Sequence, residues 1–202
     1  SYFSWALFPN AMKLCRKWAY SVKGIKPNKA KIVFANGNFH GRTLSVISAS
    51  DDQSARKDFG PFMEGILQVP YNNLKALEAL FQKDDDIAGF IIEPIQGEAG
   101  VVIPDENYLS GVRTLCDRFN ILYIADEIQT GIARTGSMLA SYDIDSMDSK
   151  SKPDVLILGK AISGGMMPVS VVMANDDVML TIILAEQDST FGCNPLASAV
   201  PI

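Results

Sequence analysis

Apolar runs of strand length alternate along the chain with segments whose apolar residues recur at helical spacing. Most of these runs are continuously apolar, which is typical of parallel strands buried on both faces of a sheet. The runs predict strands at residues 31–35, 66–69, 87–92, 121–125, 155–158 and 169–173.

Helical spacing is found at residues 11–22, 73–82 and 107–119. In the second of these segments Leu74, Leu77 and Phe81 fall on one face of the helix. Strands that alternate with helices in this way are typical of βαβ units. We therefore predict an α/β fold in which helices flank a mostly parallel sheet, with no domain boundary inside the chain. The polar, Ser- and Asp-rich stretch 141–154 predicts a surface loop.

Composition narrows the class of protein. A chain of 202 residues with 48% apolar and 20% charged positions is typical of one globular domain. The net charge of -5 argues against nucleic acid as a partner, and no apolar run is long enough to span a membrane. The three cysteines form no CxxC pair, so neither a disulfide framework nor a zinc site is indicated, and a reducing compartment fits best. Because His40 is the only histidine, a multi-histidine metal centre is excluded.

Three charged residues follow predicted strands at their carboxyl ends. Glu93 follows 87–92, Asp126 follows 121–125, and Lys160 follows 155–158 after one glycine. Ligands of open α/β sheets gather beyond the carboxyl ends of the strands. If these strands belong to one sheet, Asp126 and Lys160 approach each other at a single edge of it.

Two interpretations of Asp126 and Lys160 are open on spacing alone. They could form a structural ion pair. Alternatively, the lysine could be a nucleophile that forms an imine with a carbonyl substrate or with pyridoxal phosphate, while the carboxylate holds the pyridinium nitrogen protonated. The small residues at 161–165, "AISGG", would leave room for a flat cofactor.

Two further segments have both a structural and a functional interpretation. "GNFHGRT", 37–43, is either a simple turn or a site in which Phe39 lies on a cofactor ring and Arg42 binds a substrate carboxylate. His40 in this segment is a base or, more commonly for a lone histidine in a turn, structural. "DSTFGCNP", 188–195, is a turn or a set of donors for phosphate oxygens.

Five motifs taken together extend this interpretation: "NFHGRT", "EPIQGEAGV", "ADEIQTGIARTG", "KPDVLILGKAISGG" and "STFGCNP". In order and spacing, residues 11–197 resemble the class III pyridoxal-phosphate-dependent aminotransferases, and most closely the branch that acts on ornithine. The resemblance implies an incomplete large domain of the fold type I transferases. Residues 1–202 would be part of this cofactor-binding domain, without the N-terminal segment and the small C-terminal domain.

The resemblance also implies roles for individual residues, with pyridoxal 5'-phosphate as the cofactor and no metal. Lys160 would bind the cofactor covalently and move a proton at the substrate carbon, and Asp126 would pair with the pyridine nitrogen. Gln129 would lie near the phenolic oxygen of the ring. Phe39 and Ile128 would cover its two faces.

The remaining implied roles concern substrate and phosphate. Arg42 would take the α-carboxylate of the substrate, Glu93 would lie in the pocket wall, and Glu98 would pair with a switch arginine outside this sequence. Thr190 would bind the phosphate of a neighbouring subunit, which implies a homodimer or a higher homo-oligomer. No nucleic acid or membrane partner is expected.

The expected reaction transfers the terminal amino group of ornithine to 2-oxoglutarate and gives glutamate semialdehyde and glutamate. One alternative is another ω-amino acid transaminase, for γ-aminobutyrate or acetylornithine. The other is a truncated module without catalysis, because "YFSWALFPN", 2–10, lacks the glycine and the acidic residue of the phosphate loop of the family. The expected compartment is the mitochondrial matrix, with the cytoplasm as the alternative.

Overall fold

The computed structural model describes residues 2–3, 7–142, 150–183, 186–187 and 195. In this part of the chain one sheet has the strand order β1-β7-β6-β5-β4-β2-β3. Strands β2 to β6 are mutually parallel where they pair, whereas β7 and β1 run antiparallel to their neighbours. The predicted mostly parallel sheet is therefore confirmed. The strands are β1 Tyr2–Phe3, β2 Lys31–Ala35, β3 Ile66–Val69, β4 Ile87–Ile92, β5 Leu122–Asp126, β6 Val155–Leu158 and β7 Val171–Ala174.

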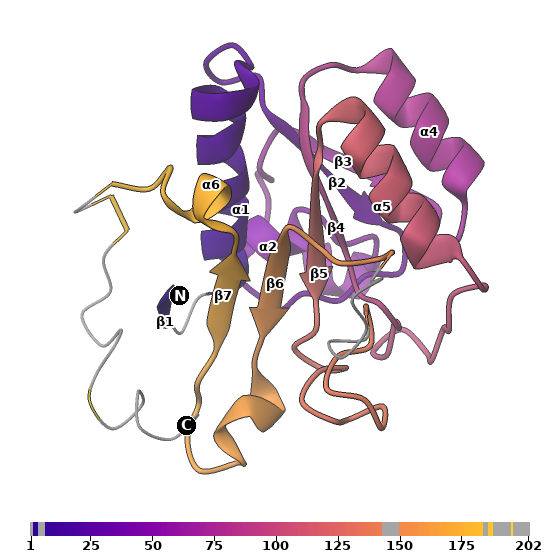
Figure 1. Ribbon diagram of the computed structural model, residues 1–202, viewed down its shortest axis with the longest axis vertical. Coiled ribbons are helices and arrows are strands. Elements are labelled where there is room, and N and C mark those ends of the chain that lie inside the picture. The colour runs from indigo at the N-terminus through magenta and orange to yellow at the C-terminus, as the bar shows by residue number, and fades with distance from the viewer. Residues whose placement is uncertain (1, 4–6, 143–149, 184–185, 188–194, 196–202) are drawn as a thin grey trace.

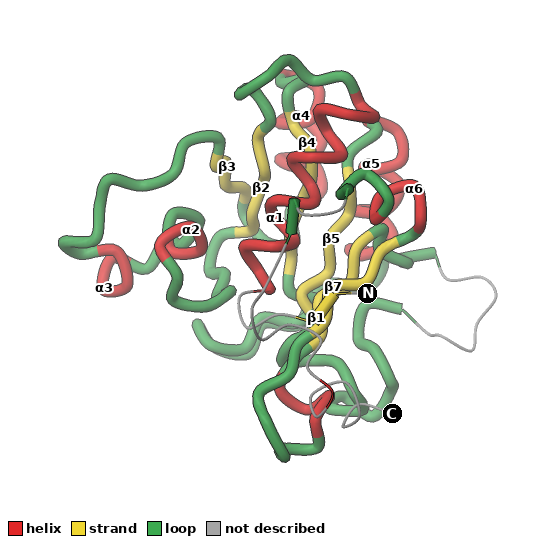
Figure 2. Tube along the Cα trace, turned by 90° about the vertical axis from the view of Figure 1, so that its left-hand side faces the viewer, coloured by secondary structure: helices red, strands yellow, loops and turns green. Residues whose placement is uncertain are grey.

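Helices cover both faces of the sheet. Helices α4 and α5 lie side by side on one face, and α1 lies on the opposite face near α6 (Figure 1). Figure 2 shows the short α2 and α3 in the excursion that connects β2 to β3. The helices are α1 Leu7–Trp18, α2 Leu44–Ile47, α3 Gln53–Arg56, α4 Leu74–Lys83, α5 Tyr108–Phe119 and α6 Asp176–Met179, with a π-helical turn Ala19–Lys23 and a 3-10 turn Lys160–Ser163.

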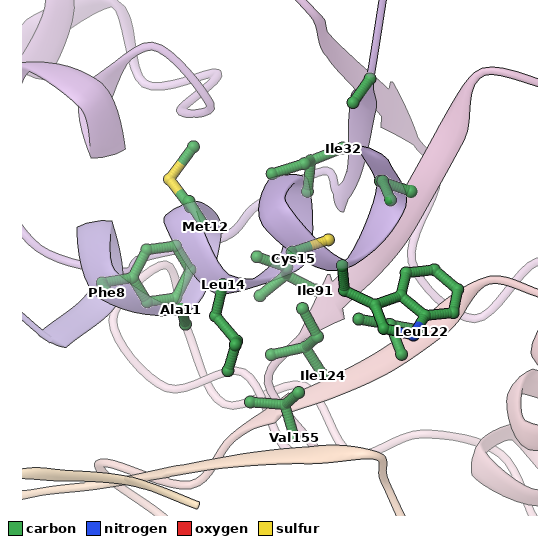
Figure 3. Close-up of a cluster of buried hydrophobic side chains, with 14 of the residues drawn as sticks. Phe8, Ala11, Met12, Leu14, Cys15, Ile32, Ile91, Leu122, Ile124 and Val155 are labelled. Carbon is green, nitrogen blue, oxygen red and sulfur yellow. The ribbon is translucent and has the colours of Figure 1, made fainter. Parts of the chain in front are cut away.

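Two apolar clusters form because successive strand residues point to opposite faces. In β4, Ile91 packs toward α1, and its neighbours Phe90 and Ile92 pack toward α4 and α5. Figure 3 shows the first cluster, in which Phe8 and Cys15 of α1 face residues from several strands. Helix α1 lies so close to the sheet that a side chain at Gly89 would press on the Cys15 sulfur at 2.6 Å.

Element boundaries differ from the predicted ones in informative ways. The strand predicted at 121–125 is β5, Leu122–Asp126, so Asp126 is the last strand residue rather than the first loop residue. The helix predicted at 11–22 begins at Leu7 and changes to π-helical geometry at Ala19. The sequence analysis missed β1, α2, α3 and α6, which are too short for a periodic pattern to identify them.

The carboxyl ends of β2, β4, β5 and β6 lie at one edge of the sheet, because these strands are parallel. This edge carries the 36–42 loop, Glu93, Asp126 and Lys160, and β5 and β6 point to it at the bottom of Figure 1. In the predicted surface loop 141–154, positions 143–149 lie outside the described residues, while Lys150 is exposed and Ser141 is buried. No described helix is both long and apolar enough to cross a membrane.

Candidate active site

Lys160 is placed at the sheet edge by the end of β6. It opens the 3-10 turn Lys160–Ser163 and has a left-handed φ of 44°, a conformation that is strained for a residue with a side chain. Its ammonium group donates a hydrogen bond to Gln129 Oε1 at 3.3 Å. Strain of this kind persists where the surrounding structure enforces it, and it concentrates at functional sites.

The glycines that follow Lys160 have left-handed backbone conformations. Gly164 and Gly165 have φ values of 59° and 81°, and no atom lies near the position of a Cβ on either residue. They line none of the cavities around Lys160. Their positive φ values shape the turn that follows Lys160. The crowded position is Gly159, where a side chain would lie 3.2 Å from a methyl group of Ile128.

Asp126 is paired with His40, which the sequence analysis favoured as structural. Asp126 is 4% exposed, and its Oδ2 lies 2.6 Å from His40 Nδ1, while its Oδ1 accepts a hydrogen bond from the Ile128 N–H at 3.1 Å. The His40 ring stacks on Phe8 with 4.3 Å between the centroids. Among the described residues, Asp126 forms no ion pair with Lys160, so the interpretation as a structural pair of these two is wrong.

Asp126 and Lys160 nevertheless line the same cavity, as the strand ends predict. This cavity of about 180 Å³, named here the lysine cavity, is bounded by Phe39, His40, Gly41, Glu93, Ile95, Asp126, Ile128, Gln129, Thr130 and Lys160. A hollow of about 420 Å³ adjoins it and shares His40, Ile128 and Lys160 with it. Phe39 and Ile128 are the large apolar side chains that the sequence analysis placed on opposite faces of a ring, and both line the lysine cavity.

Glu93 is the second buried carboxyl group of the lysine cavity. It is 6% exposed and accepts a hydrogen bond from the Phe39 N–H at 3.1 Å. Burial raises the pKa of Glu93 to about 7, and the smaller effects of His40 and of the Phe39 hydrogen bond oppose this rise. A group with this pKa changes its charge near neutral pH.

Arg42 lies on the outer side of Phe39. It is exposed, and its guanidinium carbon lies 5.2 Å from the centroid of the Phe39 ring, within the range of a cation–π contact. Arg42 and Glu98 both line a third cavity, of about 320 Å³, which also meets Phe39. The structure therefore brings together all the predicted site residues except Thr190, which lies outside the described residues.

The sequence analysis missed two residues that support Gln129. Glu127, 1% exposed, accepts hydrogen bonds from the Thr130 hydroxyl and from the N–H groups of Ala140 and Ser141, so it fixes the loop that follows β5. Gly97 lies against Gln129, and a Cβ at this position would collide with the side-chain amide. The available signals were a second acidic residue directly after Asp126 and a glycine directly before Glu98.

Comparisons with known proteins agree with this geometry. The family profile "Aminotransferase class-III" matches residues 8–202. The mitochondrial ornithine aminotransferase of Rattus norvegicus is 56% identical over 95% of this chain and 42% of its own length. The ornithine aminotransferase of Plasmodium falciparum isolate 3D7 is 51% identical over 94% of this chain and 44% of its own length.

Two solved structures of aminotransferases are also similar to this chain. The ornithine aminotransferase of Toxoplasma gondii ME49 matches with a TM-score of 0.89 and 44% identity over 96% of this chain and 44% of its own. The acetylornithine aminotransferase of Elizabethkingia anophelis matches with a TM-score of 0.78 and 44% identity over 96% and 43%. The chain thus spans less than half of the length of these relatives. The match over residues 8–202, together with the lysine cavity, shows that the chain belongs to the class III aminotransferase family.

Proposed function

We propose that this chain is the cofactor-binding part of a pyridoxal-phosphate-dependent transaminase. The reaction transfers the terminal amino group of ornithine to 2-oxoglutarate and gives glutamate semialdehyde and glutamate. The observation that carries the proposal is the lysine cavity, which is lined by an amine, a buried carboxyl group and the side chains of Phe39 and Ile128. Ornithine is favoured because the relatives that are 51–56% identical bear the name ornithine aminotransferase.

The residues of the lysine cavity fit pyridoxal 5'-phosphate. Lys160 offers an amine for the aldehyde, and Asp126 offers a carboxyl group for the ring nitrogen. His40 Nε2 is buried and has no hydrogen-bond partner in the described part of the chain, so a polar group of a bound molecule could satisfy it. The cofactor, when bound, supplies an electron sink for the negative charge that develops on the substrate carbon. A Toxoplasma gondii relative is described with pyridoxal phosphate partially occupying its active site.

The positions of the side chains around Lys160 indicate what each would do in the reaction. The Lys160 amine would hold the cofactor covalently at rest and, once released, would take and return the proton of the substrate carbon. Gln129, which binds the Lys160 ammonium group, would orient this amine. Arg42 would bind the α-carboxylate of ornithine, and Glu98, which lines the same cavity, would pair with a switch arginine outside this sequence.

The assembly and the compartment are parts of the same proposal. We propose that residues 1–202 form part of the large domain and that two copies associate, with Thr190 of each copy binding the phosphate in the other. Several relatives, including those of Rattus norvegicus, Caenorhabditis elegans and Drosophila melanogaster, are named mitochondrial, while those of Plasmodium are not. The mitochondrial matrix is therefore the proposed location, and the cytoplasm is the alternative.

Borohydride trapping tests the assignment of Lys160. The protein is incubated with pyridoxal phosphate, reduced with borohydride, digested, and the tagged peptide is identified by mass spectrometry. We expect the label on Lys160, no label in Lys160→Arg, and an unchanged label in the exposed control Lys152→Arg. A label on another lysine, or none, would show that the site assignment is wrong.

Another ω-amino acid transaminase is the second candidate, and the similarity to the acetylornithine enzyme favours it. Turnover is compared on ornithine, acetylornithine and γ-aminobutyrate in the presence of 2-oxoglutarate. Ornithine is expected to react better than γ-aminobutyrate, because its α-carboxylate meets Arg42 while its terminal amine reaches Lys160. It is expected to react better than acetylornithine, because the relatives that are 51–56% identical are named for ornithine. A labelled Lys160 without turnover on any amine would instead favour a non-catalytic, cofactor-holding module.

A further inference from the structure

The lysine cavity is lined by two carboxyl groups, and among the described residues only one of them is hydrogen-bonded to another side chain. Asp126 is paired with His40 and also accepts the Ile128 N–H. Glu93 accepts the Phe39 N–H, and none of the ion pairs among the described residues involves it. Among the described residues, Glu93 is therefore the carboxyl group of the cavity that has no hydrogen bond to another side chain.

A transaminase has to accept two substrates of different charge at the same amine. The reacting end of a diamino acid is an ammonium group next to methylene carbons. The reacting end of a 2-oxo acid is a ketone bonded directly to a carboxylate. A carboxylate that enters the lysine cavity meets Glu93, and two like charges at short range in a poorly solvated site repel strongly. An ionised Glu93 therefore favours the first substrate and opposes the second.

Starting from the proposed function, we propose that Glu93 is a specificity-determining residue that changes its charge with the substrate. Its side chain takes one proton from solvent when the 2-oxo acid enters the lysine cavity, and returns this proton to solvent when the acid leaves. With the diamino acid bound, it stays ionised and faces the incoming ammonium group. No covalent bond to carbon forms or breaks in this exchange.

The surroundings of Glu93 permit this exchange near neutral pH. The titratable groups that face it are His40 from the 36–42 loop, Asp126 at the end of β5 and Lys160 after β6, and the Tyr71 hydroxyl donates hydrogen bonds to the backbone oxygens of Glu93 and Pro94. With a pKa of about 7, Glu93 is mostly ionised at pH 8, so at this pH it can take up a proton when a substrate carboxylate comes close to it. Below pH 6 the group is already protonated, and the effect disappears.

Titration calorimetry of the full-length protein with bound pyridoxal phosphate in its aldehyde form tests the proposal. In this form 2-oxoglutarate binds without an amine with which to react, so the readout is binding and not turnover. Measurements at pH 8 in two buffers of different ionisation enthalpy give the number of protons taken up. We expect up to about one proton per 2-oxoglutarate, and a Kd that rises about tenfold per pH unit above about pH 7.5.

The variant Glu93→Gln separates charge from geometry, because its amide oxygen can still accept the Phe39 N–H. It is expected to bind 2-oxoglutarate with no proton uptake and with a Kd that is flat between about pH 7 and 9, while the exposed control Glu106→Gln behaves like the unchanged protein. Equal proton uptake in the Glu93→Gln variant and the unchanged protein would overturn the proposal.

A second measurement needs no variant. The carboxyl carbon of Glu93, observed by carbon-13 NMR, should titrate near pH 7 and at a higher pH when 2-oxoglutarate is bound. An unshifted titration would also count against the proposal. Failure of the proposed function has a different signature, which is loss of the borohydride label at Lys160 or lack of turnover on ornithine.

Discussion

The adjacent strands β4 and β5 each deliver a buried carboxyl group to the lysine cavity, but the two groups are supported differently. Asp126 of β5 has a side-chain partner in His40 and a backbone donor in Ile128. Glu93 has one backbone donor, from Phe39, and burial raises its pKa to about 7. Two carboxyl groups at neighbouring strand ends thus differ in their hydrogen-bond partners because of one imidazole.

The largest expected effect comes from removing the supported charge. Asp126→Asn keeps the shape of the side chain but removes the carboxylate that we propose pairs with the ring nitrogen of the cofactor. We expect kcat for ornithine transamination to fall by about a thousandfold, the size typical of a lost electrostatic contact to a developing charge. The decrease should exceed that in Glu93→Gln. A smaller loss in Asp126→Asn than in Glu93→Gln would reverse the two roles.

Removing the imidazole should make the two carboxyl groups more alike. His40→Ala leaves Asp126 buried with one backbone donor, and breaking a buried pair in this way costs about 3 kcal/mol in the free energy of unfolding. Urea unfolding at pH 7 measures it. Phe8→Leu, which removes the stacking ring but keeps the pair, is the control and should lose about 1 kcal/mol. Equal losses of unfolding free energy in the two variants would show that His40 stabilises the protein through its packing and not through its pair with Asp126.

The pH dependence of stability tests the second carboxyl group, Glu93, and so adds to the comparison with Asp126. Because the pKa of Glu93 is higher in the folded protein than the ordinary value of 4.5, its contribution to stability is full below pH 4.5 and is lost as pH rises through about 7. Glu93→Gln should therefore unfold with a free energy about 2 kcal/mol higher than the unchanged protein at pH 8, and with little difference at about pH 4. Thermal unfolding at the two pH values checks this, and a difference of the same size at both would contradict it.

The smallest expected effect concerns the loop that carries Gln129. Gly97→Ala places a methyl group against the Gln129 amide and should displace it from Lys160, which weakens pyridoxal phosphate binding by about tenfold, the size of one lost hydrogen bond. Fluorescence titration with the cofactor measures it. In a Gln129→Ala background the same substitution should have no further effect. An additive loss would mean that Gly97 acts through another contact.

The sequence was sufficient for the sheet and for most of the catalytic edge. Continuous apolar runs identified six of the seven strands in the described part of the chain, because a strand buried on both faces tolerates few polar residues. Lys160, Asp126 and Glu93 were found because each follows such a run. The strand β1 was missed, since two residues contain no periodic signal.

By itself, the sequence determined which chemical groups would meet, because parallel strands bring their carboxyl ends to one edge. Only the tertiary structure decided how those groups are paired. The loop after β2 folds back so that His40 reaches Asp126 and the Phe39 N–H reaches Glu93, and both contacts join residues more than fifty positions apart. The charge of a buried carboxyl group depends on its nearest neighbours in space, and no local pattern along a chain specifies those.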